Sequence, residues 1–466
     1  MLPFVAQPSF AGSRPSRRDW LRIGVPAAVG ALLPDLRAAT PIAARAKSVI
    51  VVFASGGQSQ FETWDPKPLA PVEVRGAFGS RPSAIPGVRL CEHLPRLAGL
   101  ADRYTIVRSM THDDMDHGSA CYIALTGQLH PIKSSNPPPQ ATDFPSLGAV
   151  LQRVRPSDRF PHAAFHANGP MLTPNEPGPG QFGGFLGHGY DPIQIGDVTD
   201  DRAWLKQVSS HAAVSSNRAA ARRALADNLD RQGPYSAFLP TARHDLIRKA
   251  YDLVDSPLVR GAFDIAQESA ATRDRYGRYR GGQACLLARR LVEAGVPWIT
   301  VFFNHNIRGQ DIHPEIADEY GWDTHNDIFD SMREHLLPRF DRSFSALLED
   351  LDARGLLADT LVVCMGEFGR APLVAVEKNF AGSSPGRKHW AQCYSIVLAG
   401  AGIRRGAVYG ASDRRGAYPQ VNPVTPGDLA ATLFHALGIP AETHFTDLAN
   451  RPNRITTGNP IAALFG

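Results

Sequence analysis

The chain has 466 residues, of which 43% are hydrophobic and 20% charged, the composition of a globular protein with a large core. Lys and Arg number 49 and Asp and Glu 45, so the near balance of charge gives no argument for a nucleic-acid partner. The five cysteines include no CxxC pair, which argues against a thiolate zinc site. Because the count is odd, at least one thiol is expected to be unpaired.

Residues 1–46 are predicted to be an export signal and linker. Residues 16–22 (SRRDWLR) resemble the twin-arginine motif, and the apolar run 23–33 after them is too short to span a bilayer. A frayed basic tail is the alternative. Twin-arginine export predicts a periplasmic or secreted protein whose transient partner is the twin-arginine translocation machinery. No second long apolar segment follows, so no membrane span is expected after signal removal.

Residues 47–466 are predicted to form one α/β domain. Strands that alternate with helical patterns favour a mainly parallel central sheet with helices on both faces. A long amphipathic helix is expected at 328–351, interrupted at Pro338, and the tail after the last helix is expected to be loop-like. Residues 200–290 are mostly helical and charged, and are interpreted as a helical insertion. Buried strands are expected at 47–54, 104–108, 296–303, 360–365 and 393–398.

Polar residues follow several of these strands. Asp323 and His325 are two residues apart and point to the same side of an extended chain, so an oxygen and a nitrogen can meet at one ion. Glu367 follows the strand at 360–365, and His389 lies shortly before the next strand. Sites in open α/β sheets form beyond the carboxyl ends of strands, so we expect these segments to meet there. A hydrogen-bonded core histidine is the alternative for His389.

A second polar cluster, THDDMDHGS, occupies residues 111–119, before a helix predicted from about Ser119 to Leu125. Free amides at a helix N-terminus favour an anion such as phosphate or sulfate. Asp116 or Ser119 can equally act as a simple helix cap. Both interpretations stay open at this point.

With these motifs in hand, the chain resembles the domain-of-unknown-function 1501 family, which is allied to the alkaline phosphatase and sulfatase superfamily. The resemblance covers almost everything after Lys47. It implies an alkaline phosphatase-like fold, in which one or two divalent metals activate a nucleophile at a helix N-terminus. Its most specific motifs are Gly321–His325, Gly366–Pro372, Gly386–Trp390 and Asn422–Pro426.

The resemblance also implies roles for individual residues. Two imidazoles and two carboxylates would suit zinc or manganese, and the implied metal ligands are Asp323, His325, Glu367 and His389. The segment Leu125-Thr126-Gly127 resembles the end of the sulfatase nucleophile helix, which puts His117 at the nucleophile position with Ser119 two residues on. Arg370 can clamp an anion, although a salt bridge is its alternative role. Substrate-binding roles are expected for Arg387 and Lys388.

These observations predict an exported, sulfatase-like, metal-dependent hydrolase of phosphate or sulfate esters, whose anionic substrates include polysaccharide esters. Two departures favour a single-metal site: the first strand ends at Ser55-Gly56-Gly57 where catalytic members carry an Asp, and Glu367-Phe368 stands where Asp-His is usual. They also favour the alternative of a non-catalytic binding or cell-envelope protein with a degenerate metal site. No haem, flavin or iron–sulfur signature supports a redox enzyme.

Overall fold

The computed structural model describes residues 42–134, 136–156, 164–199, 261–309 and 320–466, together with a few positions between 217 and 228. The twin-arginine-like motif and much of the predicted helical insertion lie outside these residues. Within the described residues, no helix combines the length and the apolar character that a membrane crossing requires.

An eight-stranded sheet forms the centre of the domain, in the order β12-β4-β11-β8-β1-β7-β5-β6. Strand β11 runs antiparallel to both neighbours, and the other pairs are parallel, so the expected α/β class with a mainly parallel sheet is confirmed. The strands in this order are Ala407–Tyr409, Tyr104–Met110, Tyr394–Ala399, Thr360–Met365, Ser48–Phe53, Trp298–Phe302, Ala164–Ala167 and Ile193–Ile195.

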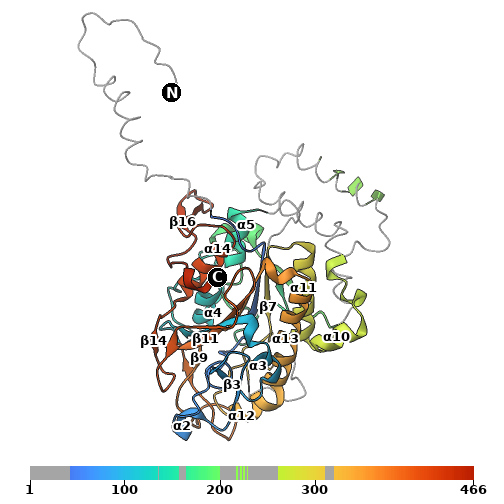
Figure 1. The fold of residues 1–466 in the computed structure, drawn as a ribbon. Helices are drawn as coiled ribbons and strands as arrows, with labels where there is room; N and C mark the ends of the chain where they lie inside the picture. Colours follow the sequence, from blue (N-terminus) through green and yellow to red (C-terminus); the bar gives the residue numbers. More distant parts are fainter. Residues whose placement is uncertain are drawn as a thin grey trace, which may run out of the picture. The chain divides into compact units, whose positions relative to one another are not determined.

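Both faces of this sheet are buried. Along β1 every residue is buried, and alternate side chains enter different cores: Ile50 and Val52 enter one, Val51 and Phe53 the other. A strand covered on both faces reads as a continuous apolar run, which is why β1 stands out in the sequence. The helices of the two faces lie on opposite sides of the sheet in Figure 1.

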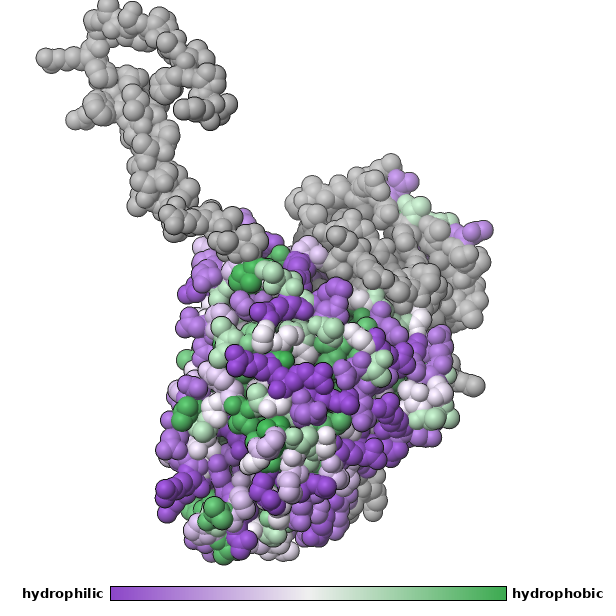
Figure 2. Space-filling model, in the orientation of Figure 1, coloured by the Kyte–Doolittle hydropathy of each residue, from purple (hydrophilic) through white to green (hydrophobic). Residues whose placement is uncertain are grey.

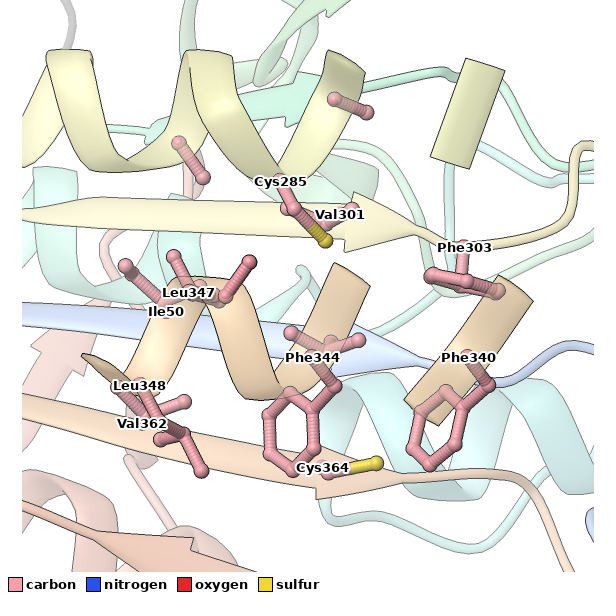
Figure 3. Close-up of a cluster of buried hydrophobic side chains, with 14 of the residues drawn as sticks. Ile50, Cys285, Val301, Phe303, Phe340, Phe344, Leu347, Leu348, Val362 and Cys364 are labelled. Atoms are coloured by element: carbon pink, nitrogen blue, oxygen red, sulfur yellow. The ribbon is translucent and has the colours of Figure 1, made fainter. Parts of the chain in front are cut away.

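The first core lies under α11 (Arg280–Ala294) and α13 (Leu337–Ala353). Figure 3 shows Cys285 of α11 beside Val301 of the sheet, and Phe344 of α13 beside Cys364 of the sheet. Helix α11 therefore covers the sheet, although it falls within the predicted helical insertion. The second core lies under α4 (His117–Thr126), α5 (Leu147–Val154) and α14 (Pro426–Ala436).

The long helix predicted at 328–351 is present with one local change. It begins as α12 (Ile328–Ser331), widens into a π-helical turn at Met332–Leu336 and continues as α13. Pro338 has no N–H and its ring crowds the turn before it. The wider π turn just before Pro338 accommodates that ring, so the helix is widened there rather than interrupted.

Smaller elements complete the domain. The tail contains a hairpin, β15 (His444–Thr446) with β16 (Pro452–Arg454), so the expectation of a loop-like tail is wrong there. All five cysteines are buried and free. Figure 2 shows a face on which polar and apolar residues mix in small patches. The other elements are α2 (Val72–Arg75), β2 (Ser80–Pro82), β3 (Arg89–Cys91), α3 (Pro95–Gly99), α10 (Ala270–Tyr276), β9 (Gly369–Arg370), β10 (His389–Trp390), β13 (Ala411–Ser412) and β14 (Pro419–Val421).

Candidate metal centre

Three histidines and one aspartate meet beyond the carboxyl ends of the strands. The Nε2 atoms of His117, His325 and His389 lie 3.2, 3.0 and 3.1 Å from Oδ1 of Asp323. The Nε2 atoms of His325 and His389 are 2.8 Å apart. Ligand atoms of His117, Asp323 and His389 all lie within 4.8 Å of one another, and His325 adjoins this group. The structure thus joins three residues singled out as ligands with His117, which was singled out as a nucleophile.

The ends of the strands determine this geometry. Because β4 and β8 are both antiparallel to β11, they point the same way, and their carboxyl ends lie at one edge of the sheet. His117 is the first residue of α4, which follows β4. Asp323 follows a backbone contact with the end of β1, in which the Trp322 amide donates to the Ser55 carbonyl at 2.9 Å. His389 lies on β10, which pairs with β9 just after β8.

The second nitrogen of each ring is bonded to the protein. Nδ1 lies 2.7 Å from Glu367 Oε1 in His117 and 2.8 Å from Glu377 Oε2 in His325. In His389 it lies 2.6 Å from the carbonyl oxygen of Met115. Carboxylates and carbonyls are acceptors, so each Nδ1 carries the hydrogen, and in its neutral form each ring presents an Nε2 lone pair. Lone pairs that converge on a carboxylate oxygen need a positive species between them, which fits a divalent metal.

The electrostatics of the centre likewise favour one added positive charge. Burial lowers the pKa of His389 to about 3, so this ring is neutral. Burial also opposes charge on His117, but the carboxylates of Asp323 and Glu367 outweigh it and raise the pKa to about 9. Burial alone would raise the pKa of Asp323, yet His117 and Arg370 hold it well below its usual value. Without a metal, the surroundings stabilise a proton at His117.

Glu367 contacts the centre through His117. Its side chain is completely buried, and Oε1 accepts from the Gly56 amide at 2.9 Å as well as from His117 Nδ1. Its Oε2 has no hydrogen-bond partner among the described residues. Glu367 was singled out as a metal ligand, but in this structure it contacts the Nδ1 of His117 rather than the point on which the Nε2 atoms converge.

Two arginines singled out for anion binding are buried among other partners. Nη2 of Arg370 lies 2.8 Å from Asp323 Oδ1 and 3.0 Å from the Trp322 carbonyl, the salt bridge that was its alternative role. Nη2 of Arg387 lies 2.8 Å from Glu62 Oε1, and its Nη1 donates to the Ala371 carbonyl. Arg387 is thus held in a separate ion pair, apart from the histidines.

Lys388 and Ser119 complete the residues singled out from the sequence. Lys388 is 69% exposed and its Nζ lies 2.8 Å from Glu377 Oε1. The buried hydroxyl of Ser119 accepts from the Ser134 amide at 3.0 Å. Ser119 therefore links the first turn of α4 to the chain beside it. As the third residue of α4 it is not the helix cap that was its alternative role.

The sequence analysis missed Glu377 and the carbonyl of Met115. Glu377 stands in an irregular loop with no periodic pattern, and 52 positions separate it from His325, the ring it contacts. A backbone carbonyl leaves no trace in the residue type. Neither partner could be found without the fold.

Comparisons with known proteins give a family but no close relative. A comparison with curated proteins gives no match. Among solved structures, the crystal structure of Ps i-CgsB is similar with a TM-score of 0.41 and 12% identity, over 86% of this chain and 73% of that one.

Two further solved structures have comparable TM-scores and sequence identities. The PsFucS1 sulfatase from a Pseudoalteromonas species matches with a TM-score of 0.39 and 15% identity, over 97% of this chain and 76% of that one. A protein in the alkaline phosphatase superfamily from Vibrio parahaemolyticus matches with a TM-score of 0.39 and 11% identity, over 86% and 69%. At this level of similarity, the activities of these proteins do not transfer to the chain.

The family comparison is of a different kind because it covers nearly the whole described domain. The model named "Protein of unknown function (DUF1501)" matches residues 46–465. This range contains every residue of the candidate metal centre. The chain belongs to the DUF1501 family.

Proposed function

We propose that this protein is a metal-dependent hydrolase of phosphate or sulfate esters. The observation that carries the proposal is the convergence of three Nε2 atoms on Asp323 Oδ1, with each Nδ1 held by another acceptor. Imidazole and carboxylate ligands suit zinc or manganese. When bound, such an ion polarises an ester oxygen and lowers the pKa of a bound water to about 7.

The residues around the centre hold these ligands in place. Glu367, Glu377 and the Met115 carbonyl fix the three rings, so that the centre is ordered before an ion or a substrate arrives. Arg370 restrains Asp323 through the same carboxylate oxygen, since its Nη2 lies 2.8 Å from Oδ1.

Charge balance favours an anionic substrate. The charges of Asp323 and Arg370 compensate each other, as do those of Glu377 and Lys388. A divalent cation would carry one more unit of charge than Glu367, the carboxylate that contacts His117, can compensate. The N-terminus of α4 adds the positive end of a helix at His117, which also favours an anion. We therefore infer an ester of phosphate or sulfate, with sulfated or phosphorylated polysaccharides among the candidates.

The proposal includes export. The motif at residues 16–22 supports transport of the folded protein by the twin-arginine machinery to the periplasm or the medium. A fusion of residues 1–46 to a reporter protein tests this step. We expect export that stops when Arg17 and Arg18 are both replaced by Lys.

Metal analysis of the purified protein tests the centre directly. We expect about one zinc or manganese per chain in the protein reconstituted with that metal, and loss of the metal in Asp323→Ala and His389→Ala. Glu442→Gln is a control, because Glu442 lies on the surface after α14. Chromogenic phosphate and sulfate esters then test turnover. A wild-type protein that binds neither metal contradicts the proposal.

One observation favours a second candidate, a binding or cell-envelope protein that does not catalyse a reaction. Arg370 already places a fixed positive charge on Asp323, so the cluster is partly compensated without an ion. The same experiment separates the two candidates. Metal binding with turnover supports the hydrolase, and metal binding without turnover across the ester panel supports the binding protein.

A further inference from the structure

We propose that Glu377 is a positioning residue for the metal ligand His325, and that it acts together with the loop that carries it. This inference rests on the proposed metal centre. The loop comprises residues 375–386, and it is closed by two backbone hydrogen bonds between Ala375 and Gly386, of 3.0 and 2.9 Å. We call these residues the 375–386 loop.

Glu377 fixes which nitrogen of His325 faces the centre. Its Oε2 lies 2.8 Å from Nδ1 of His325, and its side chain is mostly buried. A carboxylate can only accept this hydrogen bond, so Nδ1 carries the hydrogen and Nε2 presents its lone pair toward Asp323 Oδ1. A carboxylate behind a ligating imidazole also increases the electron density that the ring offers to a metal.

Phe380 of the same loop fixes the plane of the His325 ring. The two rings are stacked face to face, with centroids 3.7 Å apart and an angle of 5° between their planes. His325 is nearly buried, whereas Phe380 is 43% exposed. Stacking at this distance restrains the tilt of the His325 ring.

Asn326 ties the loop to the residue next to His325. Its Nδ2 donates to the carbonyl oxygens of Glu377, Phe380 and Ala381, at 2.9, 3.2 and 3.0 Å. Its Oδ1 accepts from the Glu377 amide at 2.8 Å. Because Asn326 is completely buried, these bonds are protected from water. The loop and the ligand segment are therefore held as one unit.

The other oxygen of Glu377 connects a second ligand segment. Oε1 lies 2.8 Å from Nζ of Lys388, the residue before His389. Glu377 thus contacts one ligand through its side chain and the neighbour of another ligand through an ion pair. The Lys388 side chain is 69% exposed, so we expect this ion pair to matter less than the bond to His325.

Zinc affinity of the full chain tests this role without any substrate. Competition with a chelator gives the dissociation constant for zinc in wild type and variants. We expect Glu377→Ala to weaken zinc binding about 10–100-fold, the usual cost of losing a carboxylate behind a ligating histidine. Phe380→Ala is expected to weaken it by less, and Lys388→Met by less than about threefold. Glu442→Gln, a surface carboxylate elsewhere, should bind zinc as wild type does.

Two further measurements keep the outcome clear. Thermal unfolding in the presence of chelator shows whether each variant is folded, and Glu377→Gln retains size and an acceptor oxygen if the Ala variant does not fold. We expect Glu377→Gln to lie between wild type and Glu377→Ala. Folded Glu377 and Phe380 variants with wild-type zinc affinity overturn the positioning role alone. A wild-type chain that binds no zinc and no manganese overturns the proposed function instead.

Discussion

Two polar side chains, Arg387 and His389, lie two residues apart in the chain and differ in how their polar atoms are satisfied. Arg387 and Glu62 are both almost completely inaccessible, and the guanidinium contacts the carboxylate through two of its nitrogens while the third donates to carbonyl oxygens. At His389 the polar atoms instead converge on one another, and the buried Nε2 of His117 and Oε2 of Glu367 have no hydrogen-bond partner among the described residues.

The contrast separates a structural role from a functional one. A buried pair whose donors and acceptors are all matched needs nothing further, and it specifies how the chain packs. A buried cluster with unmatched atoms costs free energy unless something binds there. Arg387 was predicted to bind an anionic substrate, but its surroundings give it the first role, whereas the unmatched atoms around His117 favour the second.

The largest expected effect comes from breaking the ion pair between Arg387 and Glu62. Arg387→Ala leaves the carboxylate of Glu62 buried without its partner, so we expect the free energy of unfolding to fall by about 3–5 kcal/mol. Urea denaturation followed by circular dichroism measures it. The double variant Glu62→Gln/Arg387→Met, which removes both charges, should recover much of the loss. A loss below about 1 kcal/mol for Arg387→Ala would remove the basis of the comparison.

The next largest effect is a gain of stability, which we expect when a metal ion binds the unmatched cluster. A metal that binds only the folded state stabilises it by about 2.7 kcal/mol at a concentration 100 times its dissociation constant. We expect zinc or manganese to raise the free energy of unfolding by this amount, and chelator to reverse the gain. Asp323→Ala should abolish the response, whereas Arg387→Met should retain it. An equal response in Asp323→Ala would place the bound metal elsewhere.

A buried histidine outside the cluster, His166, allows a related prediction for a polar group that already has a partner. The variable in this test is pH. His166 on β5 is buried, its Nδ1 lies 3.1 Å from Gln194 Nε2, and burial lowers its pKa to about 3. It stays neutral in the fold, whereas the unfolded chain binds a proton below pH 6.5. The contribution of His166 to the free energy of unfolding is therefore complete above pH 6.5, and it falls by about 1.4 kcal/mol per pH unit as the pH drops toward 3. Urea denaturation of wild type and His166→Gln between pH 5 and 7.5 should show this slope in their difference.

The smallest effect concerns the residue between the two groups. Lys388 is 69% exposed, so its ion pair with Glu377 is screened by water and salt. We expect Lys388→Met to change the free energy of unfolding by less than about 1 kcal/mol, measured in urea at low salt. A loss as large as that of Arg387→Ala would show that exposure does not separate these neighbours.

Much of the fold could be predicted because burial on both faces leaves long apolar runs. Strands β1, β7 and β8 are such runs, and their predicted ranges lie close to the observed ones. The direction of β11 could not be predicted, because an antiparallel strand buried on both faces has the same composition as a parallel one. The tail hairpin was missed since its strands are only three residues long.

The site was predictable only where the chain itself places ligands close together. Asp323 and His325 share one short motif, so their spacing alone predicts that the two side chains point to the same place. The role of His117 depends on the direction of α4, and that of Arg387 depends on Glu62, which is 325 positions away in the chain. Long-range pairing of this kind decides whether a charged residue is a ligand or a buried counter-ion, and no local pattern encodes it.

The close packing at Gly56 has a consequence for engineering the centre. A Cβ at this position would lie 2.6 Å from the Asp323 amide nitrogen and 2.5 Å from the Ile307 carbonyl, and its φ of +108° is strained for other residues. Replacing Gly56 with Asp or Glu, in order to add a carboxylate for a second ion, would displace the segment that carries Asp323. A side chain at Gly56 therefore requires three chain segments to move together, which a point substitution there does not provide.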